Sequence, residues 1–411
     1  MLSFQAHLRA AIASARIPPR VLAEGECRTS RGHICNLCNA STLNYTDETL
    51  AKNHALLSFW KEARLQPRLE PLIPSPRGRS YRTVTKRKVF HNNRGIKLAL
   101  INPTELGHMP VHVGECVIEP PDHNRLYRHI EQVLNTPRMS SLANVLSYVI
   151  IKGDYQDQSV ILNVEELPDA PKQVNDLSKS ITRHVASVTG VFLFEGDADD
   201  AYYLGSKRGT PEQQLRKVYG KTGLHFDLGE RRFIYSVLSF TQVNHSAAKH
   251  LVETARSMLK PRTSMQLFDL YCGYGLFSLS LASEVQHVIG IDGSRSSIND
   301  AIGNARGMGI HNARFHCVNL TKETTRNALR TMKPDDLILL DPPRNGTAHE
   351  VIEEISARSP ARVVHLFCNI DGLPEEVRRW QQCGYEMRRS VPVDMFPGTF
   401  EVEVVVLLEP R

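Results

Sequence analysis

The chain has 411 residues, of which 41% are hydrophobic and 23% are charged, as in ordinary globular proteins. This length allows two domains, and no apolar run approaches the roughly 18–20 residues that a membrane-spanning helix requires. The formal net charge of +6 is compatible with a nucleic-acid partner without establishing one. The composition therefore excludes a disordered chain and a helical membrane protein.

The start of the chain has two interpretations. The first 23 residues contain three arginines and no acidic residue, which resembles a mitochondrial transit peptide. However, Leu8 and Ala11 on one side, with Pro18-Pro19 as a stop, also fit an ordinary first helix. We expect the helix and a cytoplasmic location, with the mitochondrial matrix as the alternative. Without a secretory signal, the eight cysteines are expected to be reduced and available for metals or catalysis.

Three cysteines lie close together in a C-x7-C-x2-C run, at Cys27, Cys35 and Cys38. Three thiols at this spacing suggest a metal site that needs a fourth ligand. Cys116 is the candidate, because the other cysteines all lie in the C-terminal half. Four thiolates suit either a [4Fe–4S] cluster or a structural zinc ion, and the spacing alone does not choose between them.

Basic residues are concentrated between Lys61 and Lys97, where only two glutamates oppose them. Tyr81, Phe90 and His91 are interleaved with these cations. Such a segment can neutralise RNA phosphates while its rings stack on unpaired bases. A solvated protein surface is the alternative interpretation.

Hydrophobic periodicity divides the chain into three regions. A helical pattern at Thr46–Ala63 is followed by a proline-rich stretch at residues 70–79. Beyond it, three strand-like runs and one amphipathic helix predict an α+β region with a largely antiparallel sheet, at residues 145–151, 159–164, 190–196 and 124–134. We therefore expect a cysteine-rich region (1–75), a central α+β RNA-binding region that includes Cys116 (76–235) and a C-terminal domain (236–411).

The C-terminal part has an α/β rhythm. A helix from about Asn244 to Leu259 is followed by five short apolar strands that alternate with helices, at residues 266–272, 287–293, 313–320, 336–343 and 362–368. This alternation predicts a parallel, doubly wound sheet. The last two strands, 385–396 and 401–409, are too close in sequence to be anything but antiparallel. A parallel sheet with a C-terminal antiparallel hairpin is typical of class I (Rossmann-like) S-adenosylmethionine-dependent methyltransferases.

Cofactor motifs follow the strands. The first strand runs into Asp269-Leu-Tyr271-Cys-Gly273-Tyr-Gly275, whose glycines allow close approach of a ligand to the backbone. The second strand ends at Asp292, which is placed to accept ribose hydroxyls or to cap the next helix. Ser278 replaces the third glycine that pyrophosphate binding favours. Asp341-Pro-Pro-Arg344 ends the fourth strand at the ligand-binding edge. The pattern favours S-adenosylmethionine over a dinucleotide.

Five motifs together resemble the RNA 5-methyluridine (uracil-C5) methyltransferases, at residues 239–244 (SFTQVN), 269–275, 341–344, 367–369 (FCN) and 394–397 (DMFP). The resemblance covers about Arg232 to Pro410. It implies four residues that bind S-adenosylmethionine, namely Gln242, Tyr271, Asp292 and Asp341.

The chemistry requires a thiol and a base. Carbon 5 of uracil becomes nucleophilic only after a thiolate adds to carbon 6, and a base must then remove the carbon-5 proton. Cys368, at the end of the fifth strand, is the expected nucleophile. The resemblance makes Glu403 the base, with Glu401 as the residue most easily confused with it. Cys272 and Cys317 lie in apolar runs and are expected in the core.

The chain departs from the family pattern around this site. Cys368 is followed by Asn369-Ile370, Glu401 stands where the family usually has histidine, and Gly398 replaces another frequent histidine. Cytosine-C5 methylation is less consistent with the sequence, because the motif at 341–344 contains no second cysteine. From another class, a non-catalytic RNA-binding protein on the same fold is the alternative.

The cysteine run is similar to that of the iron–sulfur members of the family, which implies a [4Fe–4S] cluster with zinc as the alternative. Larger members carry a β-barrel RNA-binding domain before the cluster. Here the first expected cluster ligand is already residue 27, so we expect no such domain before it. The chain is most similar to the shorter members that act at uridine 747 of 23S rRNA. We therefore expect a monomer acting on a 23S rRNA hairpin, with tRNA or another rRNA site as the alternative.

Overall fold

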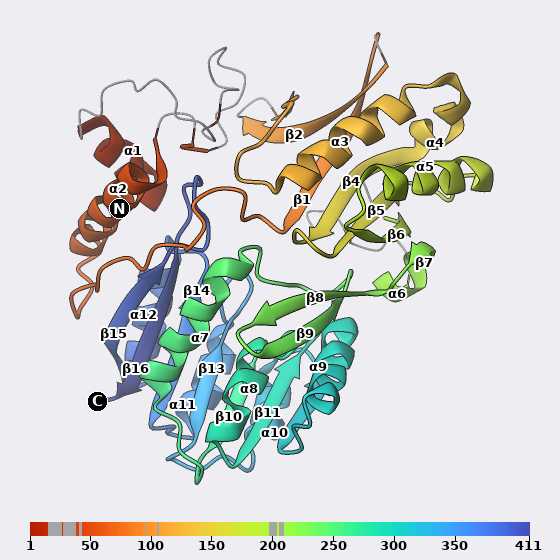
Figure 1. Ribbon diagram of the computed structural model, residues 1–411. Coiled ribbons are helices and arrows are strands. Elements are labelled where there is room, and N and C mark those ends of the chain that lie inside the picture. The colour runs from red at the N-terminus through yellow and green to blue at the C-terminus, as the bar shows by residue number, and fades with distance from the viewer. Residues whose placement is uncertain are drawn as a thin grey trace.

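The computed structural model describes residues 1–14, 27, 38–40, 43–93, 95–104, 107–196, 204 and 209–411. These residues form two seven-stranded sheets and a two-stranded sheet. The central sheet (β1–β7) lies above the C-terminal sheet (β10–β16) in Figure 1, and the helices α1 (Phe4–Ser14) and α2 (Tyr45–Glu62) lie beside the C-terminal sheet.

The central sheet has the strand order β3-β2-β1-β4-β5-β6-β7. Its strands are β1 (Val84–Asn92), β2 (Gly95–Thr104), β3 (Gly107–Val111), β4 (Leu146–Gly153), β5 (Gln158–Val164), β6 (Val188–Glu195) and β7 (Leu215–Gly220). Neighbouring strands are antiparallel except for β5 and β6. The predicted α+β region with a largely antiparallel sheet is therefore confirmed.

Each face of the central sheet has its own core. Val149 and Val160 on one face pack against α3 (Pro121–Leu134), α4 (Ser140–Val145) and α5 (Pro171–His184). Ile150 and Ile161, one position along, belong instead to a core shared with β8 (Gly223–Leu228), β9 (Arg231–Ser236) and α7 (His245–Leu259). Short helical segments complete this region, namely η2 (Pro137–Met139) and α6 (Pro211–Gln214). This alternation follows from the two-residue period of a strand, and it joins the central sheet to the C-terminal one.

The C-terminal sheet has the strand order β12-β11-β10-β13-β14-β16-β15. Its strands are β10 (Gln266–Leu270), β11 (His287–Asp292), β12 (Ala313–Cys317), β13 (Leu337–Leu340), β14 (Arg362–Phe367), β15 (Tyr385–Val393) and β16 (Glu403–Pro410). The first five in the order are parallel, and β16 is antiparallel to both β14 and β15. This confirms the predicted class I methyltransferase sheet. The hairpin connection is longer than expected and spans residues 394–402.

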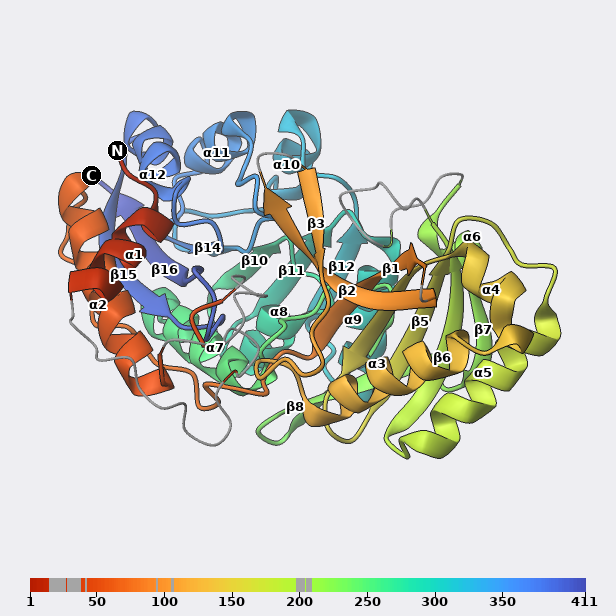
Figure 2. The same ribbon diagram turned by 90° about the horizontal axis from the view of Figure 1, so that it is seen from above.

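Helices cover both faces of the C-terminal sheet. Leu267 faces a core with α7, α8 (Leu276–Leu281) and α9 (Arg295–Gly307), whereas its neighbour Phe268 faces a core with α11 (His349–Ser356) and α12 (Leu373–Gln382). Shorter helices are η3 (Ala282–Glu284) and α10 (Lys322–Ala328). The first helix is confirmed, with Leu8 and Ala11 buried. It packs with α2 into the second of these cores, next to β15 and β16 (Figure 2).

Among the residues that the structure describes, none of the helices combines the length and the apolar character needed to span a membrane.

Candidate active site

The carboxyl ends of β10, β11 and β13 meet at one edge of the C-terminal sheet. There, Asp292 accepts hydrogen bonds from the backbone N–H of Gly273 (3.0 Å) and of Ser294 (2.7 Å). Carboxylate oxygens have further lone pairs, so Asp292 can still accept ribose hydroxyls. The N-cap of α9 is Ser294, whose side chain accepts a bond from the Ser297 N–H. The alternative role of Asp292 as that N-cap is therefore wrong.

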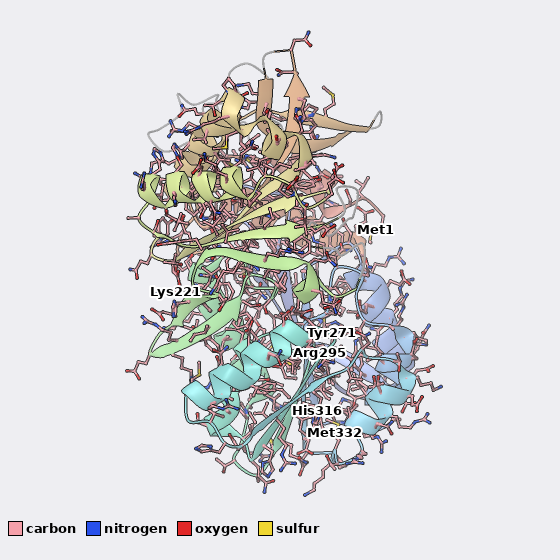
Figure 3. The ribbon with its side chains drawn as sticks, turned by 90° about the vertical axis from the view of Figure 1, so that its right-hand side faces the viewer. Met1, Lys221, Tyr271, Arg295, His316 and Met332 are labelled. Carbon is pink, nitrogen blue, oxygen red and sulfur yellow. The ribbon has the colours of Figure 1, made fainter. Side chains whose placement is uncertain are left out.

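The turn after β10 is tight. Tyr271, Gly273 and Gly275 have φ angles of 67°, 54° and 89°, in the left-handed region that glycine adopts without strain. A Cβ atom on Gly275 would lie 3.0 Å from the Leu279 side chain. In Figure 3, Tyr271 and Arg295 both lie at the end of the C-terminal domain that faces the central sheet. The backbone is thus arranged for close approach of a ligand.

Asp269, below this turn, is fully buried. The N–H and hydroxyl of Ser278 donate to its Oδ2 at 2.9 and 2.6 Å, while its Oδ1 has no partner among the described residues. Burial raises the pKa of Asp269 to about 7. Ser278, where a dinucleotide-binding motif would have glycine, therefore anchors the start of α8 to the strand.

Cys368 and Glu403 lie next to each other. The antiparallel ladder of β14 and β16 pairs Phe367 with Val404, so the next residue on each strand is Cys368 and Glu403. Directly opposite residues have Cβ atoms about 4.5–5.5 Å apart. Glu403 is 2% exposed, and its Oε2 has no hydrogen-bond partner among the described residues. Burial, and then the charge of Asp341, raises the pKa of Glu403 well above its ordinary value.

Burial also raises the pKa of Cys368, to about 12, with further increases from Glu403 and Asp341. Arg344 acts in the opposite direction and lowers this pKa. The thiol makes a long contact with the Pro342 carbonyl (4.0 Å). In the RNA-free protein it is therefore protonated at neutral pH.

Gln242 connects the loop before α7 to the end of β13. Its side-chain N–H donates to Asp341 Oδ2 at 3.1 Å, and Gln242 is 6% exposed. Burial, and then Asp269 and Asp292, raises the pKa of Asp341. Two of the predicted cofactor residues thus contact each other, and Asp341 also lies beside the predicted catalytic pair.

The two candidate bases occupy different environments. Glu401 is half-buried and pairs with Arg344 (Oε2 to Nη2, 2.6 Å), whereas Glu403 lies beside Cys368. The Asn369 side chain donates to the Arg344 carbonyl at 3.3 Å. A half-open cavity of about 100 Å³ lies beside Arg344, Cys368 and Asn369. Its lining comes from the motif loop after β13, the end of β14 and α12, and includes Pro342, Arg344, Cys368, Asn369, Glu376 and Arg379.

Comparison with known proteins agrees with this geometry. The family described as tRNA (uracil-5-)-methyltransferase matches residues 221–411. Those residues form a uracil-C5 RNA methyltransferase domain. The whole chain is similar to an uncharacterised RNA methyltransferase of Geobacter sulfurreducens, 28% identical over 98% of this chain and 80% of that protein. It is also 28% identical to the 23S rRNA (uracil(1939)-C(5))-methyltransferase RlmD of Vibrio parahaemolyticus, over 92% of this chain and 80% of the relative.

Among solved structures, the tRNA (uracil-54, C5)-methyltransferase of Pyrococcus abyssi in complex with S-adenosyl-L-homocysteine matches 89% of this chain and 84% of its own, with a TM-score of 0.66 and 19% identity. This similarity establishes a shared fold. Residues 221–411 thus match a uracil-C5 RNA methyltransferase family, and the chain shares the fold of the Pyrococcus abyssi enzyme.

The predicted metal ligands of the methyltransferase are partly described. Cys35 lies outside the described residues. Cys27 is buried, and Cys38 and Cys116 are half-buried. Within the described ranges, no three His, Cys, Asp or Glu side chains form a group that could hold a metal ion. The metal site therefore stays a prediction.

The basic segment of the methyltransferase is less available to RNA than its sequence suggested. Arg87 is buried in an ion pair with Glu119, with nitrogen–oxygen distances of 2.6 and 2.7 Å. Arg79 binds the buried Glu48 at 2.9 Å. The prediction that the segment as a whole holds phosphates is wrong for these two cations, because contact with RNA would leave buried carboxylates unpaired.

Two other expectations concern single residues. Cys272 is buried as predicted, but Cys317 is exposed, because it ends the edge strand β12. Lys52 was missed by sequence reasoning. It is fully buried between carboxylates of two elements, and its position in an ordinary helical pattern gave no signal of that role.

Proposed function

We propose that this protein methylates carbon 5 of a uridine in 23S rRNA, at a hairpin site of the uridine-747 type, with Cys368 as nucleophile and Glu403 as base. The observation that carries the proposal is the position of a half-buried thiol and a buried carboxyl as the next residues along one ladder, beside Asp341. A cytoplasmic location and a monomeric state remain predictions.

The two side chains have successive roles. The Cys368 thiol gives its proton to solvent water, and the thiolate adds to carbon 6 of uracil. The S–C6 bond forms, the C5–C6 π bond breaks, and its electron pair moves into an enolate over C4–C5, which makes carbon 5 nucleophilic. After methylation, carbon 5 carries both the new methyl group and its original proton. Glu403 takes that proton, the electron pair restores the C5–C6 double bond, and the S–C6 bond breaks to return the thiolate. The raised pKa of Glu403 makes its carboxylate, once ionised, a stronger proton acceptor.

The cofactor edge fits S-adenosylmethionine, which when bound supplies an electrophilic methyl group. Asp292 offers lone pairs to ribose hydroxyls, and the turn of Tyr271, Gly273 and Gly275 allows close approach. The unpartnered Oδ1 of buried Asp269 also favours a ligand with a donor or cationic group, since an unsatisfied buried oxygen is costly. Gln242 and Asp341 complete the predicted set.

We further propose that Cys27, Cys35, Cys38 and Cys116 hold a [4Fe–4S] cluster. The Cys27 N–H donates to the carbonyl of Ala40 (3.3 Å), two residues after Cys38. Burial chiefly raises the pKa of Cys116, and Cys38 is close enough to raise it further. About four iron and four sulfide ions per chain in anaerobically purified protein would support the cluster. If the protein contains zinc and no iron, the four cysteines form a structural zinc site instead.

An adduct-trapping assay tests the catalytic proposal. Transcripts of 23S rRNA that contain 5-fluorouridine are incubated with the protein and S-adenosylmethionine. Because fluorine cannot leave as a proton does, the S–C6 adduct persists and is visible on a denaturing gel. We expect the adduct with the unsubstituted protein and with Glu403→Gln, and none with Cys368→Ala.

The same assay identifies the alternatives. Mapping the adduct in hairpin fragments distinguishes uridine 747 from other rRNA sites, and a parallel assay with tRNA covers that substrate. If RNA binds but neither rRNA nor tRNA yields an adduct, the protein is an RNA-binding module on this fold and the catalytic assignment fails.

A further inference from the structure

A buried ionic cluster outside the active site joins α2 to the hairpin connection at residues 394–402. Lys52 is fully buried, and its ammonium group binds Glu48 Oε1 (3.0 Å), Asp394 Oδ1 (2.9 Å) and the Phe396 carbonyl (3.0 Å). Glu48 and Asp394 have no exposed side-chain surface. Arg79 pairs with the second oxygen of Glu48, so two cations balance two anions.

Hydrogen bonds from distant parts of the chain fix the first half of this connection. The Tyr45 hydroxyl donates to Asp394 Oδ2 (3.1 Å), and the Gly398 N–H donates to Glu48 Oε1. The Tyr81 hydroxyl donates to the Pro397 carbonyl at 2.9 Å. These partners come from α2 and from the start of the central region, so the connection cannot shift without breaking several buried polar contacts.

The same turn contacts the segments that carry two of the predicted cluster ligands. The Asn39 N–H, next to Cys38, donates to the Gly398 carbonyl at 2.5 Å. A Cβ atom on Gly398 would lie 2.9 Å from the Ile118 side chain, two residues after Cys116. With its φ of 85°, this position suits glycine, because a side chain here would displace its neighbours.

The held turn adjoins the proposed base. In the β15–β16 ladder Val393 pairs with Glu403, and Asp394 is the residue that follows Val393. Lys52 therefore binds the residue that follows strand β15, directly beside Glu403. We propose that Lys52 is a positioning residue for proton removal: through Asp394 and Phe396 it fixes the hairpin end so that the Glu403 carboxyl stays in reach of carbon 5. This inference rests on the proposed function.

Such a role predicts an effect on one step. Addition of the Cys368 thiol depends on the end of β14, where no contact with Lys52 is recorded among the described residues, whereas proton removal depends on the hairpin. Displacement of a catalytic group by about 1 Å can slow its step on the order of 100-fold. A residue that only stabilised the fold would slow both steps in proportion to the folded protein lost.

The two steps can be measured separately with full-length protein and 23S rRNA transcripts. Adduct formation is followed with 5-fluorouridine RNA, and proton removal is followed as tritium released from [5-³H]uridine RNA. For Lys52→Met we expect adduct formation within about threefold of the unsubstituted protein and tritium release lowered about 10- to 100-fold. Covalent protein–RNA complex should then accumulate on ordinary uridine RNA.

A milder pair of variants tests the same role even if Lys52→Met fails to fold. Tyr45→Phe removes the hydrogen bond to Asp394 and the one that the Ser75 N–H donates to the same hydroxyl. Tyr385→Phe removes a hydrogen bond to the Pro360 carbonyl at the opposite end of β15. We expect a severalfold fall in the ratio of tritium release to adduct formation for Tyr45→Phe and an unchanged ratio for Tyr385→Phe.

Equal falls in both steps for Lys52→Met and Tyr45→Phe, or no change in either step, would overturn the positioning role. If the unsubstituted protein itself forms no adduct, the proposed function fails first and this inference fails with it.

Discussion

At the scale of single residues, the state of the Cys368 thiol is the central question. Reactive cysteines usually have lowered pKa values, because the thiolate is the nucleophile. Here burial and two neighbouring carboxyl groups raise the pKa to about 12, and Arg344 is the described cation that lowers it. Arg344 is in turn paired with Glu401 at 2.6 Å. Glu401 thus weakens the contribution of Arg344, which favours the thiolate.

Replacement of Glu401 by glutamine should therefore make the thiol more acidic. Without the negative charge of Glu401, the positive charge of Arg344 is no longer partly cancelled. Arg344 then stabilises the Cys368 thiolate more strongly, so the pKa of Cys368 falls. The pair is partly exposed, and solvent screening limits the shift to roughly half a pH unit. The measurement is the rate of Cys368 alkylation by iodoacetamide against pH, in RNA-free protein, with Cys368→Ala to subtract the other cysteines.

Arg344→Gln is the matched control, because it removes the cation and should shift the alkylation midpoint to higher pH. An unchanged midpoint in Glu401→Gln would show that Glu401 does not compensate the charge of Arg344.

Sequence reasoning could identify Cys368, Asp341 and Asp292 because each ends a strand of a predictable parallel sheet. It could not identify the pair of Arg344 with Glu401, which are 57 positions apart and meet only when β16 lies next to β14. Cys317 was misplaced for a related reason. An apolar run does not indicate whether its strand is central or at the sheet edge.

At the scale of elements, strand β4 is connected to the loop that carries Gln242. Lys152 on β4 is buried, and its ammonium donates to the carbonyls of Val237 (2.9 Å) and Ser239 (2.6 Å). Burial lowers the pKa of Lys152 to about 7, against a smaller opposing effect of Asp300. The central sheet is thus connected to the cofactor edge through a lysine that titrates near neutral pH.

This lysine should make stability depend on pH. The ordinary lysine pKa of about 10.4 applies in the unfolded chain, so between pH 7 and 10 the unfolded state binds more protons than the folded state. Stability contributed at this site therefore rises with pH across that window, by at most about 1.4 kcal/mol per pH unit. Urea denaturation at pH 7.5, 8.5 and 9.5 should show the difference between unsubstituted protein and Lys152→Met growing with pH.

An exposed lysine gives the control. Lys249 pairs with Glu253 on the surface of α7, and Lys249→Met should differ from the unsubstituted protein by the same amount at each pH. A difference for Lys152→Met that is flat over the same range would mean that Lys152 stays charged in the folded protein.

Helices and strands were predicted correctly where the hydrophobic periodicity of the sequence determines them. The prediction failed where a side chain distant in the sequence determines where a strand ends. The parallel strands and α7 were predicted because their apolar runs are regular. The connection at residues 394–402 was expected to span only residues 397–400. Asp394 and Phe396 leave the ladder because Lys52, more than 340 positions earlier, binds them.

At the scale of the whole molecule, the cores do not follow the predicted boundaries. Residues of α1 and α2, including Phe4 and Phe59, share one core with Phe268 of β10 and Val404 of β16. The ring centroids of Phe4 and Phe59 are 6.3 Å apart in an edge-to-face arrangement. A cysteine-rich region was expected to precede the methyltransferase domain, but its helices complete one face of that domain's sheet. Local periodicity cannot indicate which sheet an amphipathic helix will cover.

This shared core predicts that a substitution in α2 destabilises the C-terminal sheet. Phe59 is fully buried, and Phe59→Ala should lower the free energy of unfolding by about 3–5 kcal/mol, through lost transfer energy and the cavity that remains. Leu57, on the same helix but 44% exposed, gives the control, with a change in Leu57→Ala of about 0.5 kcal/mol or less. Hydrogen exchange of backbone amides in β16 should accelerate in Phe59→Ala and not in Leu57→Ala. Unchanged exchange in β16, with loss of protection confined to α1 and α2, would instead mean that the two helices unfold independently of the sheet they cover.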